Sequence, residues 1–474
     1  MAFNCYDFWL TFPFIFLLYW IIPHRFNTVR NAYLLIISYL LYLNWNPSFA
    51  IVLVGVTLIS YAGGYCIECA NKYRKFYCWL FVILGLLPLL VFKYYNFINE
   101  TVTKALASVG LHFSLTGLEW AVPIGISFYT LQAVGYIMDV YHQRIPATRN
   151  IFTYALFISF FPQVTSGPIS TAKDLMPQFA VPHVFNYEKA KAGLKMFLWG
   201  LFLKVYLADR VGMYVDTVFP YYMHFSGAVC LFASFMYSIQ IYSDFARYSL
   251  MAIGIAKTLG FDLINNFERP YFAASVTEFW RRWHISLTKW LTTHIYINLG
   301  GNRCSKLRQY ANILVTFLVS GLWHGANMTF VFWGLLHGLY LVIEKAILGD
   351  KLKAEIKNGN KGFSLFKLLR IVITFNLVSF TWIFFRMPTF IDAKLFIKKI
   401  FFEFGEFSMK PLTPAIALII GFGIILLIGY DIVKEYNLRI FRHTLFKWVF
   451  YILIACLIFS TGVLDASQFI YVGF

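Results

Sequence analysis

The stretch Leu318-Val-Ser-Gly-Leu-Trp-His-Gly-Ala-Asn-Met-Thr-Phe-Val-Phe-Trp-Gly334 places a histidine in a glycine-flanked break between two strongly apolar runs. One run starts after Arg308, and the other continues to Glu344. An ionisable group between two such runs is costly in a bilayer, so its presence predicts a function. Whether these runs cross a membrane is decided by the rest of the chain.

The composition predicts an integral membrane protein. Of the 474 residues, 59% are hydrophobic and 13% are charged, whereas a soluble protein carries about a quarter charged residues. Apolar runs recur at 8–22, 33–43, 50–59, 79–91, 228–239, 313–322, 329–343, 371–385, 415–432 and 448–459. A spanning helix needs about 20 residues, and flanking residues extend most runs, so we expect an all-α polytopic protein with about twelve spanning helices. No polar linker interrupts the pattern, which predicts a single membrane-embedded domain over 1–474.

Basic clusters between the apolar runs predict the orientation of the chain. The net charge is +18, and lysines and arginines gather within 25–30, 72–75, 351–370 and 434–442. The positive-inside rule makes these loops cytoplasmic and places both termini outside. Residues 1–22 lack a basic n-region and a clear cleavage site, so we expect them to remain as the first span. A basic inner face could also bind anionic lipid or a phosphate-bearing donor. We expect no nucleic acid as a partner.

Two polar interruptions lie in the first half of the chain, at 122–141 and 161–169. They contain prolines, small residues and the polar side chains Gln132, Asp139 and Gln163. Broken helix at membrane depth is tolerated where protein or a water-filled cavity covers it. We therefore expect re-entrant segments around a central cavity, and a packed helix kink is the alternative.

A third interruption runs from Glu268 to Arg308 and contains Glu278-Phe-Trp-Arg-Arg-Trp-His-Ile-Ser-Leu287. Its alternating tryptophans and arginines predict an interfacial helix, with aromatic rings at headgroup depth and guanidinium groups toward water or phosphate. Arg281 and Arg282 are candidates for binding the phosphate of a donor. Lipid anchoring, or pairing with an acid such as Glu278, is the alternative.

Histidine can take a proton from an attacking hydroxyl near neutral pH, so His324 is the candidate base. It lies about fifteen residues after Arg308, the nearer inner boundary, which is roughly 20 Å along a helix. A base at that depth could be reached by one reactant from each side. The spacing alone leaves open a hydrogen-bonded packing histidine.

Other chemistry-bearing side chains have plainer interpretations. His284 could polarise a thioester, orient a partner or anchor at the interface, and His337 is expected to pack in the bundle. Asp244 is an acid in an apolar helix, and we expect it to pair with a buried histidine or arginine. Cys66 and Cys69 form a lone C-x-x-C without a histidine nearby, so no metal site is expected. No hydrolase elbow, Walker loop or dinucleotide fingerprint is present.

Motifs along nearly the whole chain resemble the membrane-bound O-acyltransferase superfamily, and specifically its bacterial branch with the alginate O-acetylation membrane subunit. The motifs are Ser127-Phe-Tyr-Thr-Leu-Gln132, Asp139-Val-Tyr141, Phe161-Pro-Gln163, Ser166-Gly-Pro-Ile169, Glu278 to Leu287, Leu299-Gly-Gly-Asn-Arg303, Gly321-Leu-Trp-His-Gly-Ala326 and Phe469-Ile-Tyr471. The resemblance implies that His324 is the essential intramembrane histidine and His284 a second, supporting one. It also implies a central cavity in which donor and acceptor channels meet.

Two departures from the family pattern concern residues near these motifs. Where many alginate-type members have a glycine and a second acid after Asp244, this chain has Arg247 and Leu250. After Ser166-Gly-Pro-Ile169, the polar pair that often ends in arginine is Ser170-Thr171. Both departures leave the identity of donor and acceptor open and leave the histidines in place.

The sequence therefore predicts a bacterial inner-membrane O-acyltransferase without a bound cofactor. The expected donor is acetyl-CoA or another acyl thioester, and the acceptor is a hydroxyl of an extracytoplasmic glycan or of a membrane-anchored partner acyltransferase. Substrate contacts are expected from Arg281, Arg282, Trp323, Asn327, Asp244 and Gln132. The alternatives are a long-chain lipid acyltransferase, a transporter or flippase with an intramembrane His/Asp pair, and a scaffold of an export complex.

Overall fold

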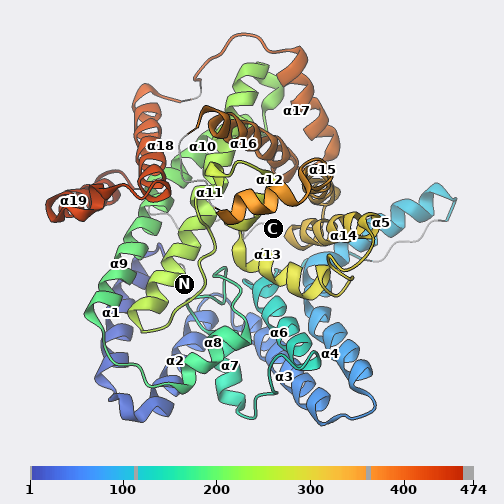
Figure 1. Cartoon of the computed structure of the whole chain (residues 1–474), viewed down its shortest axis with the longest axis vertical. Coiled ribbons are helices and arrows are strands. Elements are labelled where there is room, and N and C mark those ends of the chain that lie inside the picture. Colours follow the sequence, from blue (N-terminus) through green and yellow to red (C-terminus); the bar gives the residue numbers. More distant parts are fainter. Residues whose placement is uncertain (1–2, 112–115, 359–363, 411, 463–474) are drawn as a thin grey trace. The chain divides into compact units, whose positions relative to one another are not determined.

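The computed structural model describes residues 3–111, 116–358, 364–410 and 412–462, and every regular element in these ranges is a helix (Figure 1). The all-α prediction is confirmed. The chain divides into two compact units: unit 1 is Met1–Leu194 with Ala252–Ile264, and unit 2 is Lys195–Met251 with Asn265–Phe474. The prediction of a single membrane domain stays a prediction. The motif Phe469-Ile-Tyr471 lies outside the described residues.

Unit 1 is built from the N-terminal helices. They are α1 (Tyr6–Ile21), α2 (Asn27–Leu43), α3 (Pro47–Cys69), α4 (Arg74–Leu89), α5 (Tyr95–Ser108), α6 (Ile126–Tyr141), α7 (Ile151–Ser159) and α8 (Ala172–Ala180), with the short turns η1 (His24–Phe26) and η2 (Leu90–Tyr94). Two further helices, α9 (Tyr187–Phe202) and α11 (Gly227–Thr258), contribute residues to both units.

Unit 2 holds both histidines singled out by the sequence. Its helices are α10 (Asp209–Val218), α12 (Val276–Arg282), α13 (Ile285–Leu291), α14 (Lys306–His324), α15 (Met328–Asn358), α16 (Leu365–Arg386), α17 (Phe390–Phe402), α18 (Pro414–Glu435) and α19 (Thr444–Thr461). Its short turns are η3 (Leu203–Ala208), η4 (Tyr222–His224), η5 (Pro270–Phe272), η6 (Thr292–Tyr296) and η7 (Arg439–Arg442).

Six helical segments among the described residues are long and apolar enough to cross a membrane. They are Pro47–Cys69, Arg74–Ser108, Met328–Gly349, Leu365–Arg386, Pro414–Glu435 and Thr444–Thr461. A seventh span results if α1 and the segment His24–Leu43, bent by 103°, are one broken span. The chain is thus a multi-pass membrane protein, but the predicted count of about twelve spans is not confirmed. The count from apolar runs is higher because it includes helices such as α11, whose buried polar side chains lower its apolarity.

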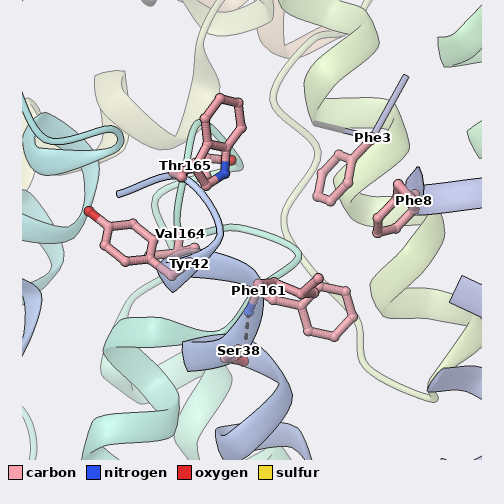
Figure 2. A pocket seen from close by; sticks show the side chains of 9 residues that line it. Phe3, Phe8, Ser38, Tyr42, Phe161, Val164 and Thr165 are labelled. Atoms are coloured by element: carbon pink, nitrogen blue, oxygen red, sulfur yellow. Dashed lines mark hydrogen bonds between the residues drawn. The ribbon is translucent and has the colours of Figure 1, made fainter. Parts of the chain in front are cut away.

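The predicted interruption at 161–169 is an irregular segment buried within unit 1. α7 ends at Ser159, and the chain forms turns rather than helix before α8. The backbone N–H of Phe161 donates to the hydroxyl of Ser38, at 3.1 Å, beside a cavity of about 20 Å³ (Figure 2). The surrounding protein thus provides a hydrogen-bond partner for the irregular backbone at this point. The other interruption is smaller than expected, because α6 is continuous from Ile126 and only the residues before it are irregular.

α14 and α15 cross closely because glycines remove side chains from the contact. A Cβ on Gly321 would clash with the backbone of Phe330, and a Cβ on Gly334 would clash with the carbonyl oxygen of Phe317. Small residues permit such close approach of membrane helices. The crossing fixes the end of α14 and hence the position of His324.

Replacing Gly334 with valine should destabilise unit 2 by about 1–3 kcal/mol or prevent its folding, because backbone atoms stand where the new side chain must go. Gly421 in α18 is the matched control, since no atom lies within 4 Å of a Cβ built there. Thermal unfolding of both variants in detergent measures the difference. Equal unfolding temperatures for Gly334→Val and Gly421→Val would contradict the close crossing.

The polar stretch 268–308 packs into unit 2 as the short helices α12 and α13 rather than lying on a surface. Trp280 and Trp283 are buried, whereas Arg281 between them is exposed. Both tryptophans pack against protein, and the depth of this segment in the membrane stays a prediction. Aromatic and polar side chains alternate along α12 as the sequence predicts. The aromatic face packs against protein, because α12 contacts α15 and α16 (Figure 1).

Candidate functional site

His324 is the last residue of α14 and is 3% exposed. Its ring lies among three aromatic rings, with centroid distances of 4.9 Å to Trp323, 5.0 Å to Trp333 and 5.2 Å to Phe385. Trp333 comes from α15 and Phe385 from α16, so three helices fix the imidazole. The helix ends here because the chain turns at Gly325, where a side chain would clash with the ring of Phe330.

His284 lies at the junction of α12 and α13 and is fully buried. Its backbone is left-handed, with φ of 43°, a conformation that costs a non-glycine residue energy and is often found at functional sites. The centroid of its ring lies 6.4 Å from that of His324 and 5.8 Å from that of Trp323. The structure therefore brings together the two histidines, which are 40 positions apart in the sequence.

Asn266 sets the tautomer of His284. Its Oδ1 atom accepts from the backbone N–H of Ser286 at 3.1 Å and from the hydroxyl of Ser286 at 2.9 Å, and it lies 3.2 Å from Nδ1 of His284. Its Nδ2 atom donates to the hydroxyl of Ser249 at 3.1 Å, which fixes the orientation of the amide. An amide oxygen cannot donate, so Nδ1 of the neutral His284 ring carries the proton and Nε2 carries the lone pair.

Burial lowers the pKa of His284 to about 3. Taking a charged imidazolium out of water is unfavourable, so the ring is neutral near pH 7. A neutral imidazole whose tautomer is fixed accepts a hydrogen bond or a proton at one ring nitrogen only, which in His284 is Nε2. Beside His324 it forms a site of two imidazoles, which is suited to moving a proton from a hydroxyl.

His337 packs in the bundle, as the sequence predicts. Nε1 of Trp280 donates to its Nδ1 atom at 3.2 Å, and its Nε2 atom lies 2.9 Å from the hydroxyl of Thr381. That hydroxyl donates to the carbonyl of Val378, so His337 donates to it in turn. Both ring nitrogens therefore bond residues of neighbouring helices.

Arg281 and Arg282 differ in their surroundings. The guanidinium of Arg282 bonds Glu278 at 2.6 Å and both carboxylate oxygens of Glu435 at 2.9 and 3.0 Å. The alternative of pairing with Glu278 is thereby confirmed, and Arg282 ties α12 to the end of α18. Arg281 is exposed, so it is the better placed of the two for an external phosphate.

Asp244 belongs to a buried cluster of charges. Its Oδ1 atom lies 2.7 Å from Nε of Arg247 and 3.4 Å from Nζ of Lys204, which also pairs with Asp209. Each of these four side chains is at most 4% exposed. The prediction that Asp244 pairs with a buried arginine is confirmed, and the partner is Arg247, one of the departures from the family pattern. Opposite charges balance, so the cluster avoids the cost of a lone buried charge.

The other predicted substrate contacts have defined structural roles. Trp323 is 6% exposed and contacts both histidine rings. Asn327 caps α15, because its Oδ1 atom accepts from the N–H of Thr329 at 3.1 Å, and its Nδ2 atom donates to the carbonyl of Pro388 at 2.6 Å. Gln132 belongs to unit 1, where it donates to the carbonyl of Ser170 at 3.4 Å. Their contact with substrate stays a prediction.

Three residues of the site were not singled out by the sequence: Asn266, Trp333 and Phe385. Asn266 carried a weak signal, since it lies two positions before the polar stretch that begins at Glu268. The aromatic residues carried none, because one more ring in an apolar helix is indistinguishable from ordinary core. The predicted central cavity with its donor and acceptor channels stays a prediction.

Comparison with known proteins points to the part of the chain that contains the two histidines. The model of the membrane-bound O-acyltransferase family matches residues 143–357, which include both histidines. A probable alginate O-acetylase AlgI of Pseudomonas syringae pv. tomato is 38% identical over 420 residues, covering 88% of this chain and 78% of that protein. A peptidoglycan O-acetyltransferase of Helicobacter pylori is 35% identical, with 78% and 73% covered. A teichoic acid D-alanyltransferase of Streptococcus thermophilus is 27% identical, with 70% and 80% covered.

Proposed function

Since this chain belongs to the membrane-bound O-acyltransferase family and is an O-acyltransferase, we propose that it moves an acyl group, acetyl in the first instance, from a thioester to a hydroxyl, with His324 as the base. The observation that carries the proposal is the pair of buried imidazoles with ring centroids 6.4 Å apart. The acceptors named for the relatives are alginate, peptidoglycan and teichoic acid. We extend that class to this chain: an extracytoplasmic polysaccharide or peptidoglycan, reached directly or through a membrane-anchored partner acyltransferase.

In the proposed reaction, His324 takes the proton of the acceptor hydroxyl as its oxygen attacks the thioester carbonyl. The bond between the carbonyl carbon and sulfur then breaks, and His324 gives the proton to the departing thiolate. An ester, a free thiol and a neutral His324 result, so atoms and charge balance without a further reactant. The neutral His284, with its lone pair on Nε2, accepts a hydrogen bond in the site and orients the reacting group. Trp323 and Trp333 exclude water, which would otherwise hydrolyse the thioester.

The donor we propose is acetyl-CoA or another acyl thioester, bound as a substrate and entering from the cytoplasm. The exposed Arg281 supplies a cation for its phosphates, while Arg282 holds α12 in place through Glu278 and Glu435. An inner bacterial membrane with both termini outside fits this arrangement, because the basic loops then face the compartment that contains the donor.

The test uses the purified full-length protein in detergent with radiolabelled acetyl-CoA and a polysaccharide acceptor. We expect free thiol to appear in step with label on the acceptor. A transporter or flippase would release no thiol, and that result would remove the proposed function. Competition by donors of increasing chain length then separates an acetyl-specific site, which rejects chains beyond a few carbons, from a long-chain lipid acyltransferase.

Asn266→Ala should lower kcat about tenfold to a hundredfold with little change in KM for the donor. The reason is that the variant removes the amide oxygen that holds the His284 ring in one tautomer and one orientation. Ser249→Ala is the matched control, since it removes only the bond that orients the amide of Asn266. Steady-state kinetics of both variants measures the split between kcat and KM. A raised KM with unchanged kcat would show that His284 acts in binding rather than in proton movement.

A further inference from the structure

A second polar cavity lies in unit 1, where α3 ends, α4 begins and α6 ends. Its volume is about 300 Å³, and its lining includes Glu68, Arg74, Val140, Gln143 and Arg144. Gln143 and Arg144 are exposed, so the cavity opens at the surface. Pockets of this size are at the lower limit for small-molecule ligands and exceed what a single phosphate needs.

The charge around this cavity is predominantly positive. Lys72 and Lys75 flank Arg74 in the sequence and are exposed, and Arg144 and Arg149 follow α6. The carboxylates among these groups already have partners. Glu68 accepts from the N–H of Ala147 at 2.9 Å and from Arg149 at 2.6 Å, and Asp139 pairs with Arg144 at 2.9 Å. These two arginines balance the two carboxylates, and Lys72, Arg74 and Lys75 leave the surroundings of the cavity with a net positive charge.

Arg74 has unused hydrogen-bonding capacity. Its Nη2 atom makes two long bonds of 3.3 Å, to the carbonyls of Val140 and Tyr141, and its buried Nε atom has no hydrogen-bond partner among the described residues. An unsatisfied buried donor costs free energy, which a ligand oxygen would recover. Arg74 also begins α4, whose N-cap residue Tyr73 provides no side-chain cap, so the positive end of the helix adds to the field.

The cavity lies at the ends of two candidate spans, Pro47–Cys69 and Arg74–Ser108. Residues at the ends of spanning helices stand at the depth of lipid headgroups, where phosphates are abundant. A planar guanidinium binds phosphate through two parallel bonds. The cavity thus combines the position, the charge and the donor geometry of a phosphate site.

We propose that this cavity binds a phosphate group, held by Arg74 and Arg144. The phosphate belongs either to the headgroup of an anionic phospholipid or to a soluble phosphate compound. The site is separate from the two histidines and does not depend on the proposed function. Its occupant ties the ends of α3, α4 and α6 together.

The experiment uses delipidated full-length protein and two probes, phosphatidylglycerol and inorganic phosphate. Native mass spectrometry counts the bound phosphatidylglycerol, and thermal unfolding reports stabilisation by phosphate. The variants are Arg144→Gln, Arg74→Gln with Arg144→Gln, and the charge-retaining Arg144→Lys. The control Lys306→Gln with Arg308→Gln removes two exposed cations from the first turn of α14.

We expect the double arginine variant to bind phosphatidylglycerol at least about tenfold more weakly, since two charge-assisted hydrogen bonds are lost. The control should bind within about twofold of the original protein, whereas Arg144→Lys, which keeps the charge but loses the planar fork, should bind more weakly than the original protein and more tightly than Arg144→Gln. Loss of lipid binding in the double arginine variant identifies the occupant as a lipid headgroup. Unchanged lipid binding in that variant, together with loss of stabilisation by phosphate, identifies the occupant as a soluble phosphate compound. If the double variant does not fold, Arg144→Gln alone gives the same comparison. Unchanged binding of both probes in the arginine variants would overturn the proposal.

Discussion

His324→Ala should lower acyl transfer by roughly 10²–10⁴, the contribution of a positioned base to the rate. Burial lowers the pKa of His284 to about 3, which makes it a much weaker base, and His337 uses both ring nitrogens within the bundle. Release of free thiol from labelled acetyl-CoA measures the loss.

The variant must be separated from simple misfolding, since the His324 ring packs among three aromatic rings. His324→Gln fills much of the same space but cannot take a proton, so it should be equally inactive while keeping its unfolding temperature. His224→Ala removes an exposed histidine of η4 and should leave the rate unchanged. Transfer by His324→Gln at more than about a tenth of the original rate would remove His324 as the base.

Asp244→Ala should lower the free energy of unfolding by about 3–5 kcal/mol, the cost of breaking a buried ion pair and leaving its partner charged. The substitution takes the carboxylate away from Arg247, which is 1% exposed, and from Lys204. Thermal unfolding in detergent measures the effect, with Asp216→Ala as control. Asp216 pairs with Arg386 at 2.5 Å but is half exposed, so its loss should cost less than about 1 kcal/mol.

A double variant distinguishes charge imbalance from loss of packing in this cluster. Asp244→Leu with Arg247→Met removes both charges and leaves the pair of Lys204 with Asp209. Replacing a buried ion pair by apolar residues of similar volume is often neutral or stabilising, so the double variant should be more stable than Asp244→Ala. If the double variant is no more stable, the cluster does not act through charge balance.

The sequence predicted those parts of the site that depend on local pattern. The break between two apolar runs is present, with α14 ending at His324 and α15 starting at Met328, because glycines and the capping side chain of Asn327 fix that turn locally. The ion pair of Asp244 with Arg247 joins positions three apart on one helix, which is a spacing that sequence reveals.

What the sequence could not predict depends on contacts between distant segments. Asn266 reaches His284 across an irregular connection, and Lys204 reaches Asp244 from 40 positions away on a π-helical turn. Trp280 and Trp283 face protein, although their pattern equally fits a membrane surface, because periodicity shows that a face is apolar but not what covers it. The predicted number of spans is too high to be confirmed for the same reason: an apolar run such as 228–239 in α11 indicates burial in protein as readily as contact with lipid.

We propose that the two reactants meet at one imidazole inside the protein. A cryo-electron microscopy map of the protein with a non-hydrolysable acyl-CoA analogue tests this meeting point. We predict that the acyl end lies beside His324, with its carbonyl carbon within about 3–3.5 Å of a position that a hydroxyl hydrogen-bonded to His324 can occupy. An analogue whose acyl end lies elsewhere, with the His324 ring enclosed by protein on every side, would contradict the account.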